Sequence, residues 1–384
     1  MNASLHNGKE MVVVISDFQD GIEEFEAIPS VDWFRDQWLS GARGAPPHKL
    51  QSVRPIEVVG GYLDRLPLSL LKSGIVSHAE IWSHWRGTNP PIESVHSGVA
   101  IRRRAFRMNG PSAPFSSNDM LGFIAAFGPP SILCVWGLGV DESILKVCDT
   151  SFKIYNSIDV PALRVPPDVS RHFDLVLTGA DWQSDEVLAR HPSMLTAVMP
   201  IGPEFASDMT FRPLGLQKHY DIIYVAAAQA YKRHDILFAA LARLPRSLRT
   251  LCVCGYGEMA DDLHRKVQEL GLTVDFVDPP GLSFEGVNRT MNMAKMGVVC
   301  GIDDGAPAIL TEYMLAGIPV LANSHLRCGL QYITPETGMT ASPENFHEGI
   351  RQVLNRLDHF QPRSTVLRHW TWRHSVQRLQ ELLN

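Results

Sequence analysis

Short apolar runs alternate with amphipathic segments along the second half of the chain. The apolar runs predict five strands, over residues 221–226, 250–254, 273–277, 297–300 and 319–322. Apolar positions at helical spacing predict helices over residues 234–244, 258–270, 284–294, 308–316 and 343–357. Strands that alternate with helices in this way form parallel sheets covered by helices. This half therefore predicts a doubly wound α/β domain, with ligands expected beyond the carboxyl ends of its strands.

The first half follows the same alternation less regularly. Strands are predicted at residues 11–15, 56–59, 132–135, 153–155, 175–178 and 197–200, and helices at residues 118–127, 141–147 and 184–190. The charged run at residues 102–107, RRRAFR, is compatible with an edge strand or a loop. We expect the two halves to meet within residues 202–219, and a last amphipathic helix over residues 368–383.

Composition narrows the class of protein. The chain has 384 residues, of which 45% are hydrophobic and 20% are charged, enough for two α/β domains of ordinary size. The formal net charge of −6 argues against a nucleic-acid partner. The first residues lack the apolar region of a signal peptide, and no run reaches the roughly 18 apolar residues of a membrane span. A cytoplasmic protein is expected, and loose docking on the cytoplasmic face of a membrane is left open.

The six cysteines form no C-x-x-C pair and stand largely in apolar runs. We interpret them as small buried residues in a reducing compartment, and we expect no metal site. They are Cys134, Cys148, Cys252, Cys254, Cys300 and Cys328.

The most informative segment is residues 302–322, IDDGAPAILTEYMLAGIPVLA. It predicts a loop, a helix and a strand, with Asp304 and Glu312 eight residues apart and Gly317 as the helix C-cap. Free backbone N–H groups at the start of a helix bind anions, and flanking carboxylates accept hydrogen bonds from hydroxyl groups. The segment therefore fits a diphosphate joined to two sugars, a nucleotide sugar, although an ordinary α/β unit with two surface carboxylates would have the same spacing.

The same segment resembles the Glu-x7-Glu motif of retaining GT-B glycosyltransferases, the family 4 or group 1 type. The first glutamate of that motif is replaced here by Asp304, which is shorter by one carbon–carbon bond of about 1.5 Å. The matching residues are Gly305, Pro307, Leu310, Glu312, Met314, Gly317, Pro319, Val320 and Ala322. The resemblance covers roughly residues 127–384 and is strongest from residue 221 onward.

The resemblance implies a GT-B fold: two Rossmann-like domains with a deep interdomain cleft and a C-terminal helix that crosses back to the first domain. The expected domains are residues 1–205 on the acceptor side, residues 206–365 for the nucleotide sugar, and the helix within residues 366–384. It also implies a metal-independent retaining glycosyltransferase without a cofactor. The donor would be a UDP- or GDP-linked sugar, and the hydroxyl acceptor could be a growing polysaccharide or other glycan, a lipid-linked molecule or a small molecule.

By this resemblance Lys232 binds the diphosphate, Asp304 contacts the donor sugar, and Glu312 binds the ribose hydroxyls. Further donor contacts are expected around the turn at residues 253–258 and at the start of the helix, where the backbone N–H groups would meet phosphate or sugar. A lone G-x-G turn is also compatible with a tight strand-to-helix connection. The remaining donor-binding candidates are Gly255, Gly257, Gly305, Ala306, Ala308, Ile309 and Arg233.

Several departures from the family pattern bear on activity. Ala227 replaces an arginine, and Ile158 replaces a histidine next to Asp159, which we take as a third catalytic candidate. Other histidines of the first half, such as His84, could substitute for the missing one or be structural. The arginines of residues 102–107 could attract a phosphorylated or lipid-linked acceptor. The alternative to a transferase is a nucleotide-sugar-binding protein of this fold with little or no transfer activity.

Overall fold

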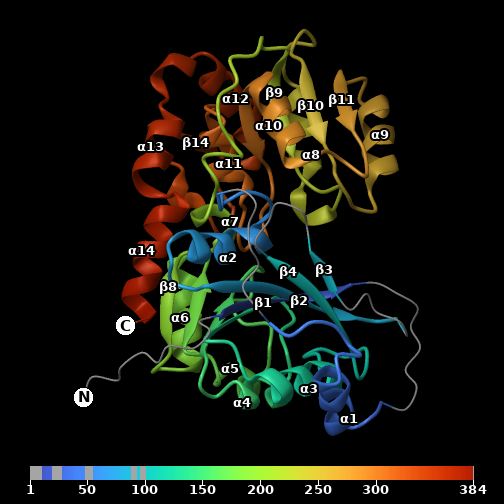
Figure 1. The fold of residues 1–384 in the computed structure, drawn as a ribbon. Helices are drawn as coiled ribbons and strands as arrows, with labels where there is room; N and C mark the ends of the chain where they lie inside the picture. The colour runs from blue at the N-terminus through green and yellow to red at the C-terminus, as the bar shows by residue number, and fades with distance from the viewer. Residues whose placement is uncertain (1–10, 20–27, 48–54, 88–92, 96–100, 384) are drawn as a thin grey trace. The chain divides into compact units, whose positions relative to one another are not determined.

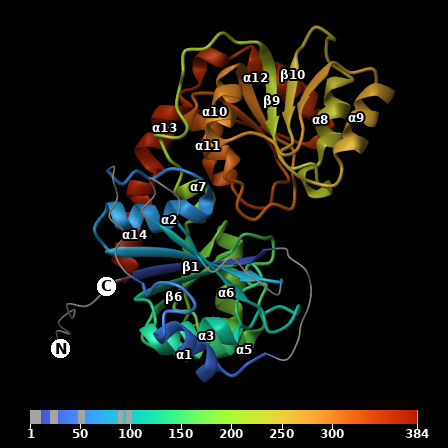
Figure 2. The ribbon, with the colours of Figure 1, turned by 45° about the vertical axis from the view of Figure 1, so that its right-hand side comes forward.

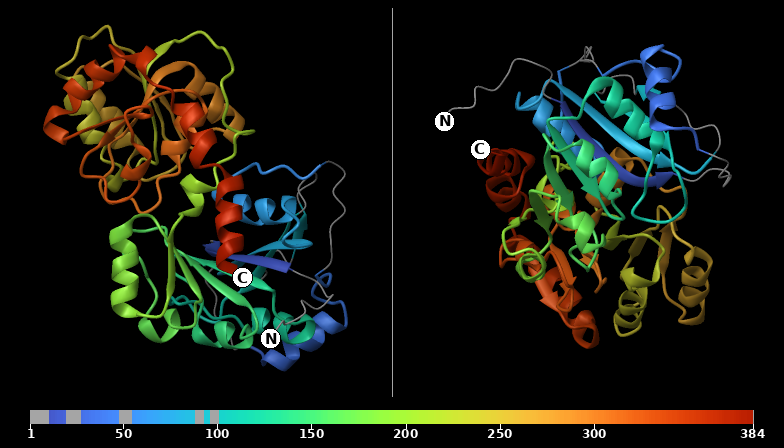
Figure 3. Two further views of the ribbon diagram at one scale, coloured as in Figure 1. Left: turned by 90° about the vertical axis from the view of Figure 1, so that its left-hand side faces the viewer. Right: turned by 90° about the horizontal axis from the view of Figure 1, so that it is seen from below.

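The computed structural model describes residues 11–19, 28–47, 55–87, 93–95 and 101–383 (Figure 1). The chain divides into two compact units. The first unit comprises Met1–Val58, Leu63–Val198 and Val376–Asn384, and the second comprises Val59–Tyr62 and Met199–Ser375. The last helix, α14 (Trp372–Leu383), is continuous through the point where the two units divide (Figure 3).

The first unit is built on a sheet of eight strands in the order β3-β4-β2-β1-β5-β6-β7-β8 within the described residues. All neighbouring strands are parallel except the short edge strand β3, which is antiparallel to β4. The strands are β1 (Met11–Gln19), β2 (His78–Trp85), β3 (Glu93–Val95), β4 (Arg102–Arg107), β5 (Ile132–Trp136), β6 (Phe152–Asn156), β7 (Leu175–Thr178) and β8 (Leu195–Val198). The helices are α1 (Val31–Leu39), α2 (Tyr62–Lys72), α3 (Asn118–Phe127), α4 (Glu142–Val147), α5 (Pro167–Ser170) and α6 (Asp181–Arg190).

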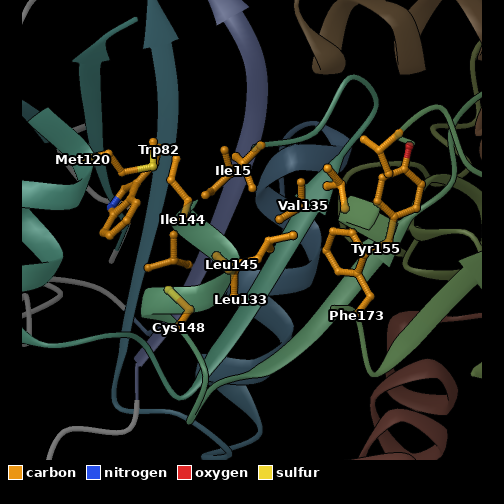
Figure 4. Packing of buried hydrophobic residues seen from close by; sticks show 14 of the residues in the cluster. Ile15, Trp82, Met120, Leu133, Val135, Ile144, Leu145, Cys148, Tyr155 and Phe173 are labelled. Carbon is orange, nitrogen blue, oxygen red and sulfur yellow. The ribbon is translucent and has the colours of Figure 1, made fainter. Parts of the chain in front are cut away.

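One hydrophobic cluster joins this sheet to the helices on one of its faces. Ile15 of β1, Leu133 of β5 and Tyr155 of β6 point into it from the sheet, and Met120 and Ile144 reach it from α3 and α4 (Figure 4). The central strands are buried on both faces, so they read as continuous apolar runs, as expected for parallel sheets.

The second unit has a parallel sheet in the order β11-β10-β9-β12-β13-β14. Apolar residues of α8, α9 and α12 form one hydrophobic cluster with this sheet, and those of α10, α11 and α13 form another. Figure 2 labels these helices around the sheet. The strands are β9 (Tyr220–Val225), β10 (Thr250–Val253), β11 (Val274–Val277), β12 (Ala294–Val299), β13 (Val320–Asn323) and β14 (Gly338–Ala341). The helices are α7 (Ile201–Glu204), η1 (Ala230–Lys232), α8 (His234–Leu241), α9 (Ala260–Glu269), α10 (Phe284–Asn292), α11 (Ile309–Leu315), η2 (Leu330–Tyr332), η3 (Pro343–Asn345), α12 (Phe346–Leu354), η4 (Leu357–His359) and α13 (Pro362–His369).

The structure confirms the expected α/β class with two parallel sheets, and all five strands and five helices predicted for the second half are present. Strand β14 and helix α13 were not predicted. The helix expected over residues 368–383 is divided, because α13 ends at His369 and α14 begins at Trp372. Thr371 lies between them and forms an isolated bridge with Ala206, which interrupts the helical pattern.

The prediction of a strand at residues 56–59 is wrong, because residues 55–59 form no regular element and lead into α2. Strand β2 was missed because its sequence, HAEIWSHW, carries polar residues at positions that the fold buries. Hydrophobic patterning cannot identify a strand whose buried polar groups are satisfied by partners far away in the sequence.

Those partners lie on β4, the charged run that was expected at an edge or in a loop. It is instead the second strand of the sheet, covered by β3. Arg104 is fully buried and bonds to both carboxylate oxygens of Glu80 on β2, at 2.7 and 2.9 Å, while Trp82 donates its indole N–H to the same carboxylate at 2.7 Å. Arg103 pairs with Asp64, and Arg102 donates to the carbonyl of Pro46. These three arginines therefore have structural partners.

The six cysteines are buried and free, as expected. Among the described residues, no helix is long and apolar enough to cross a membrane.

The Glu80–Arg104 pair generates the first prediction. Glu80→Gln removes the charge of the carboxylate that the buried Arg104 guanidinium holds at two points, so the free energy of unfolding should fall by about 3–5 kcal/mol. Chemical denaturation measures this change. Asp185→Asn, which removes an exposed carboxylate on α6 of the same unit, should change stability by less than about 0.5 kcal/mol. Equal losses in both variants would show that the buried pair is not a determinant of stability.

Candidate active site

The order of strands in the second unit reverses next to β9. From β9 the chain first adds β10 and β11 on one side, and then β12, β13 and β14 on the other. Loops that follow the strands on either side of such a switch point diverge, and the crevice between them is where open α/β sheets bind ligands. The site therefore belongs to the loops after β9 and β12.

Two charged side chains meet across this switch point. Lys232, in η1 after β9, forms an ion pair with Asp304, in the loop after β12. The two side chains are only 17% and 10% exposed. The same two loops also touch through the backbone, since a Cβ atom on Gly301 would lie 3.2 Å from the carbonyl oxygen of Tyr231. Sequence positions 72 residues apart thus form one compact group.

The pair is held by its surroundings. Tyr224 of β9 donates its hydroxyl to the carbonyl of Lys232, and Ala306 donates its backbone N–H to Oδ1 of Asp304 at 3.3 Å. Burial alone would lower the pKa of Lys232, but the Asp304 carboxylate outweighs it and holds that pKa above its usual value. The Lys232 ammonium is therefore charged at neutral pH and available as a partner for an anion.

Two tyrosines complete the group. The Lys232 ammonium lies 4.7 Å from the centre of the Tyr231 ring, within the range of a cation–π contact. Burial raises the pKa of Tyr231, Lys232 opposes that rise, and Asp304 and Tyr256 add to it, so these four residues share one electrostatic environment. Tyr256 is 60% exposed. Sequence reasoning did not assign either tyrosine a role, although each stands next to a residue it singled out, Tyr231 before Lys232 and Tyr256 between the two glycines of the G-x-G turn.

The glycines of that turn allow loops to approach one another. A Cβ atom on Gly257, whose φ is +119°, would lie 2.4 Å from the carbonyl oxygen of Ala228, and the N–H of Ala228 donates to the backbone carbonyl of Tyr256 at 2.7 Å. Gly255 packs against Gly281 in the loop after β11, where an added Cβ would lie 2.5 Å from the Gly255 Cα. These contacts join the loops after β9, β10 and β11, and a direct role of the glycines in binding stays a prediction.

The helix predicted to follow Asp304 is α11, only seven residues long. Residues 306–308 pack against Gly202 of α7, where an added Cβ would lie 3.0 Å from the Cβ of Ala308. Glu312 is largely buried on α11, whose position is fixed by Tyr313: its hydroxyl accepts the N–H of Val225 in β9 at 2.7 Å. The structure therefore brings Lys232 and Asp304 into contact and places Glu312 on the helix that follows.

The comparisons with known proteins agree with this geometry. Residues 208–359 match the family model described as glycosyl transferases group 1, so the match covers most of the second unit. The match supports a relationship to a glycosyltransferase family. No curated protein sequence matches the chain.

Solved structures resemble the whole chain. Sucrose-phosphate synthase from Thermosynechococcus elongatus aligns with a TM-score of 0.65 at 16% identity, covering 97% of this chain and 98% of that one. The Anabaena protein HepE, solved with UDP and glucose, aligns at 0.63 and 12% identity, covering 97% and 99%. The fold is GT-B. The match to the pneumococcal O-GlcNAc transferase GtfA is partial: its TM-score is 0.55 at 9% identity, and it covers 70% of this chain and 60% of that protein.

In this GT-B chain the other predicted site residues have partners outside the Lys232 group. Arg233 binds both carboxylate oxygens of Asp235, at 2.8 Å each. Asp159 belongs to the first unit, where it pairs with Arg164 at 2.9 Å. No group of three or more His, Cys, Asp or Glu side chains among the described residues is arranged to hold a metal ion.

Arg233 also carries backbone strain. Its φ of 54° and ψ of 47° are left-handed, and no other non-glycine residue in the described ranges has a positive φ. Glycine adopts this conformation without steric cost, whereas a residue with a Cβ atom does not. Arg233→Gly and Arg233→Ala both remove the exposed pair with Asp235, so their difference isolates the backbone. The glycine variant should be about 1–2 kcal/mol more stable in chemical denaturation. Equal stabilities would show that this residue is not left-handed in solution.

His234 packs behind Lys232, against the Tyr224 ring at 4.8 Å. Burial, aided by Lys232, lowers the pKa of His234 to about 4. In the unfolded chain the pKa of a histidine is about 6.5, so between pH 4 and pH 6.5 the unfolded state binds more protons than the folded state. The contribution of His234 to stability is therefore fully present above pH 6.5 and is lost as the pH falls toward 4. Between pH 7 and pH 5 the free energy of unfolding of the wild type should fall by about 2 kcal/mol more than that of His234→Phe. Parallel losses in urea denaturation would contradict a buried neutral His234.

Proposed function

We propose that the chain is a metal-independent, retaining glycosyltransferase of the family 4 type, which moves a sugar from a nucleotide-diphosphate donor to a hydroxyl acceptor. The observation that carries the proposal is the Lys232–Asp304 pair across the switch point of the unit that matches the glycosyltransferase family model. A fixed cation and a fixed carboxylate at the same crevice are what a donor with a charged diphosphate and a neutral sugar requires.

In this proposal the bound donor breaks the ion pair between Lys232 and Asp304 and gives each side chain a new partner. The diphosphate takes the Lys232 ammonium, which stabilises the negative charge that grows on the leaving group. Asp304 then accepts a hydrogen bond from a hydroxyl of the donor sugar, and Glu312 accepts from the ribose. Tyr256 offers an exposed ring to the base beside the turn formed by Gly255 and Gly257.

The transfer step requires no cofactor. The bond between the anomeric carbon and the phosphate oxygen breaks, and a bond from the acceptor oxygen to that carbon forms on the same face of the sugar. The acceptor proton passes to the leaving phosphate oxygen, so charge and atoms balance. The donor is UDP- or GDP-linked. HepE and GtfA were solved in complex with UDP, and a third fold relative is the UDP-forming α,α-trehalose-phosphate synthase from Burkholderia vietnamiensis.

Nucleotide titration tests the donor site. Isothermal calorimetry with UDP and GDP should show binding of one of them by the wild type. Lys232→Met and Glu312→Gln should each weaken it at least about tenfold, the loss expected for a charge-assisted hydrogen bond. The matched control is Lys295→Met, because Lys295 pairs with Asp221 at the opposite end of the same two strands, β9 and β12. Equal weakening by Lys295→Met, or none by Lys232→Met, would refute the assignment.

Asp304→Asn separates transfer from binding in the same experiment. The neutral amide of this variant no longer holds the Lys232 ammonium by charge, so affinity for the nucleoside diphosphate should stay the same or rise, while release of nucleotide from a nucleotide sugar should fall. Nucleotide binding by the wild type without turnover of any UDP- or GDP-sugar, across neutral and phosphorylated acceptors, would instead establish the alternative of a binding protein that lacks transfer.

A further inference from the structure

The diphosphate of the proposed nucleotide sugar needs more than one partner in the second unit. It carries several negative charges, and Lys232 offers it a single ammonium, which Asp304 already balances in the free protein. Asp303, on the same loop as Asp304, adds an exposed carboxylate. A like charge close to a phosphate opposes its binding. A diphosphate that binds at Lys232 therefore requires a further hydrogen-bonding group beside the ammonium.

Two of the expected partners are engaged elsewhere. Arg233 binds both carboxylate oxygens of Asp235, at 2.8 Å each. The start of α11 offers little, because this helix has only seven residues and residues 306–308 pack against Gly202. The further partner is therefore expected among the other side chains that touch Lys232.

Tyr231 lies directly against the Lys232 ammonium. The centre of its ring is 4.7 Å from Nζ. The carbonyl oxygen of Tyr231 packs against Gly301, where an added Cβ atom would lie 3.2 Å away, and the next carbonyl, that of Lys232, accepts the hydroxyl of Tyr224. The backbone at Tyr231 is thus fixed, while the residue is 37% exposed. A ligand that reaches the ammonium also reaches this residue.

The hydroxyl of Tyr231 keeps its proton at neutral pH. Burial raises the pKa of Tyr231, Lys232 opposes that rise, and Asp304 and Tyr256 add to it. A protonated phenol donates one hydrogen bond, and such a bond is stronger when its acceptor is charged. The phenol carries no positive charge, so Asp303 and Asp304 do not attract it as they would attract a second cation. A neutral hydrogen-bonding group therefore suits a phosphate that lies beside carboxylates.

The ring of Tyr231 has a separate effect on the ammonium. When the nucleotide sugar breaks the ion pair, Asp304 no longer holds Lys232 in place. The contact between the ammonium and the face of the ring is independent of that pair, because Tyr231 precedes Lys232 in the same turn, η1. A cation–π contact of this kind is attractive. The ammonium therefore keeps one of its present partners when the diphosphate binds.

We propose that Tyr231 is a further nucleotide-binding residue: its ring keeps the Lys232 ammonium in place, and its hydroxyl donates a hydrogen bond to the diphosphate. This inference rests on the proposed transferase function. It deepens that function, because it assigns the second partner of the diphosphate to a neutral side chain and not to a second cation.

Calorimetry on the full chain tests the role of Tyr231 with two substitutions. Tyr231→Phe keeps the ring and removes only the hydroxyl. Affinity for UDP or GDP, whichever the wild type binds, should fall at least about tenfold, the loss of a hydrogen bond to a charged group. Tyr231→Leu also removes the ring and should weaken binding further. Without nucleotide, Tyr231→Phe should unfold at the same urea concentration as the wild type, which separates a loss of binding from a loss of structure.

Tyr220→Phe is the matched control. Tyr220 is the first residue of β9, and its ring lies 5.2 Å from the guanidinium of Arg249. It is therefore another tyrosine ring beside a cation, at the opposite end of the strand that leads to η1. This variant should bind the nucleotide as the wild type does.

Arg327→Met tests a second cation as the alternative partner. Arg327 is an exposed residue of the loop after β13, and its backbone N–H donates to the carbonyl of Ile302 at 2.9 Å, next to the loop that carries Asp304. If Arg327→Met weakened nucleotide binding and Tyr231→Phe did not, the diphosphate would be held by a second cation, and the inference would fail.

The remaining outcomes separate this inference from the transferase proposal. Nucleotide binding by Tyr231→Phe that equals that of the wild type, or an equal loss in Tyr220→Phe, would overturn the role of the Tyr231 hydroxyl and leave the nucleotide site intact. A lower urea midpoint for Tyr231→Phe would also overturn it, because the hydroxyl would then be a structural group. Absence of UDP and GDP binding by the wild type would instead refute the nucleotide site itself.

Discussion

An ion pair that is mostly removed from water determines how the second unit is organised around its site. A buried ammonium or carboxylate is strongly destabilising unless it has a charged partner. The contact between Lys232 and Asp304 therefore holds the loop after β9 against the loop after β12. The strand order reverses at β9, and the pair joins the loops that follow the two strands at this point, β9 and β12. The pair is therefore a structural contact of the free protein, and in the proposed function a diphosphate and a sugar hydroxyl replace the two halves of it.

The backbone around the pair is shaped by close approaches that side chains would prevent. Gly257 lies on Ala228, Gly281 lies on Gly255, and Gly301 lies on Tyr231. Each contact joins loops that follow different strands, so the loops behave as one layer and not as independent segments. Rigid placement matters for the proposed chemistry, since catalytic groups that are held before the substrate arrives need no reorganisation during the reaction. Arg233 belongs to the same layer. Its strained, left-handed backbone turns the chain from the end of η1 into the start of α8.

The features of the fold and the site that could be predicted are those encoded in short segments of the sequence. Contacts between residues far apart in the sequence could not be predicted. The strands and helices of the second half follow from apolar runs and helical spacing, and Asp304 and Glu312 follow from a motif within 21 residues of chain. The contact between Lys232 and Asp304 follows only when the strand order is known. In the first half, β2 and β4 were missed or misplaced because Glu80 and Arg104 resemble surface residues until they are seen to neutralise each other.

The departures from the family pattern at the donor site are consistent with one another. The family has an arginine where this chain has Ala227, and a glutamate where it has Asp304, so one positive charge is lost and one carboxylate is shortened. Ala227 is nearly buried beside Ala228, in the layer of joined loops, where a long cationic side chain would have to be accommodated or expelled. With that charge absent, Lys232 is the cation that Asp304 has to balance at this crevice, and a short carboxylate braced by the Ala306 N–H suffices to reach it. The substitutions therefore leave a balanced pair of one ammonium and one carboxylate in place of a larger charged set.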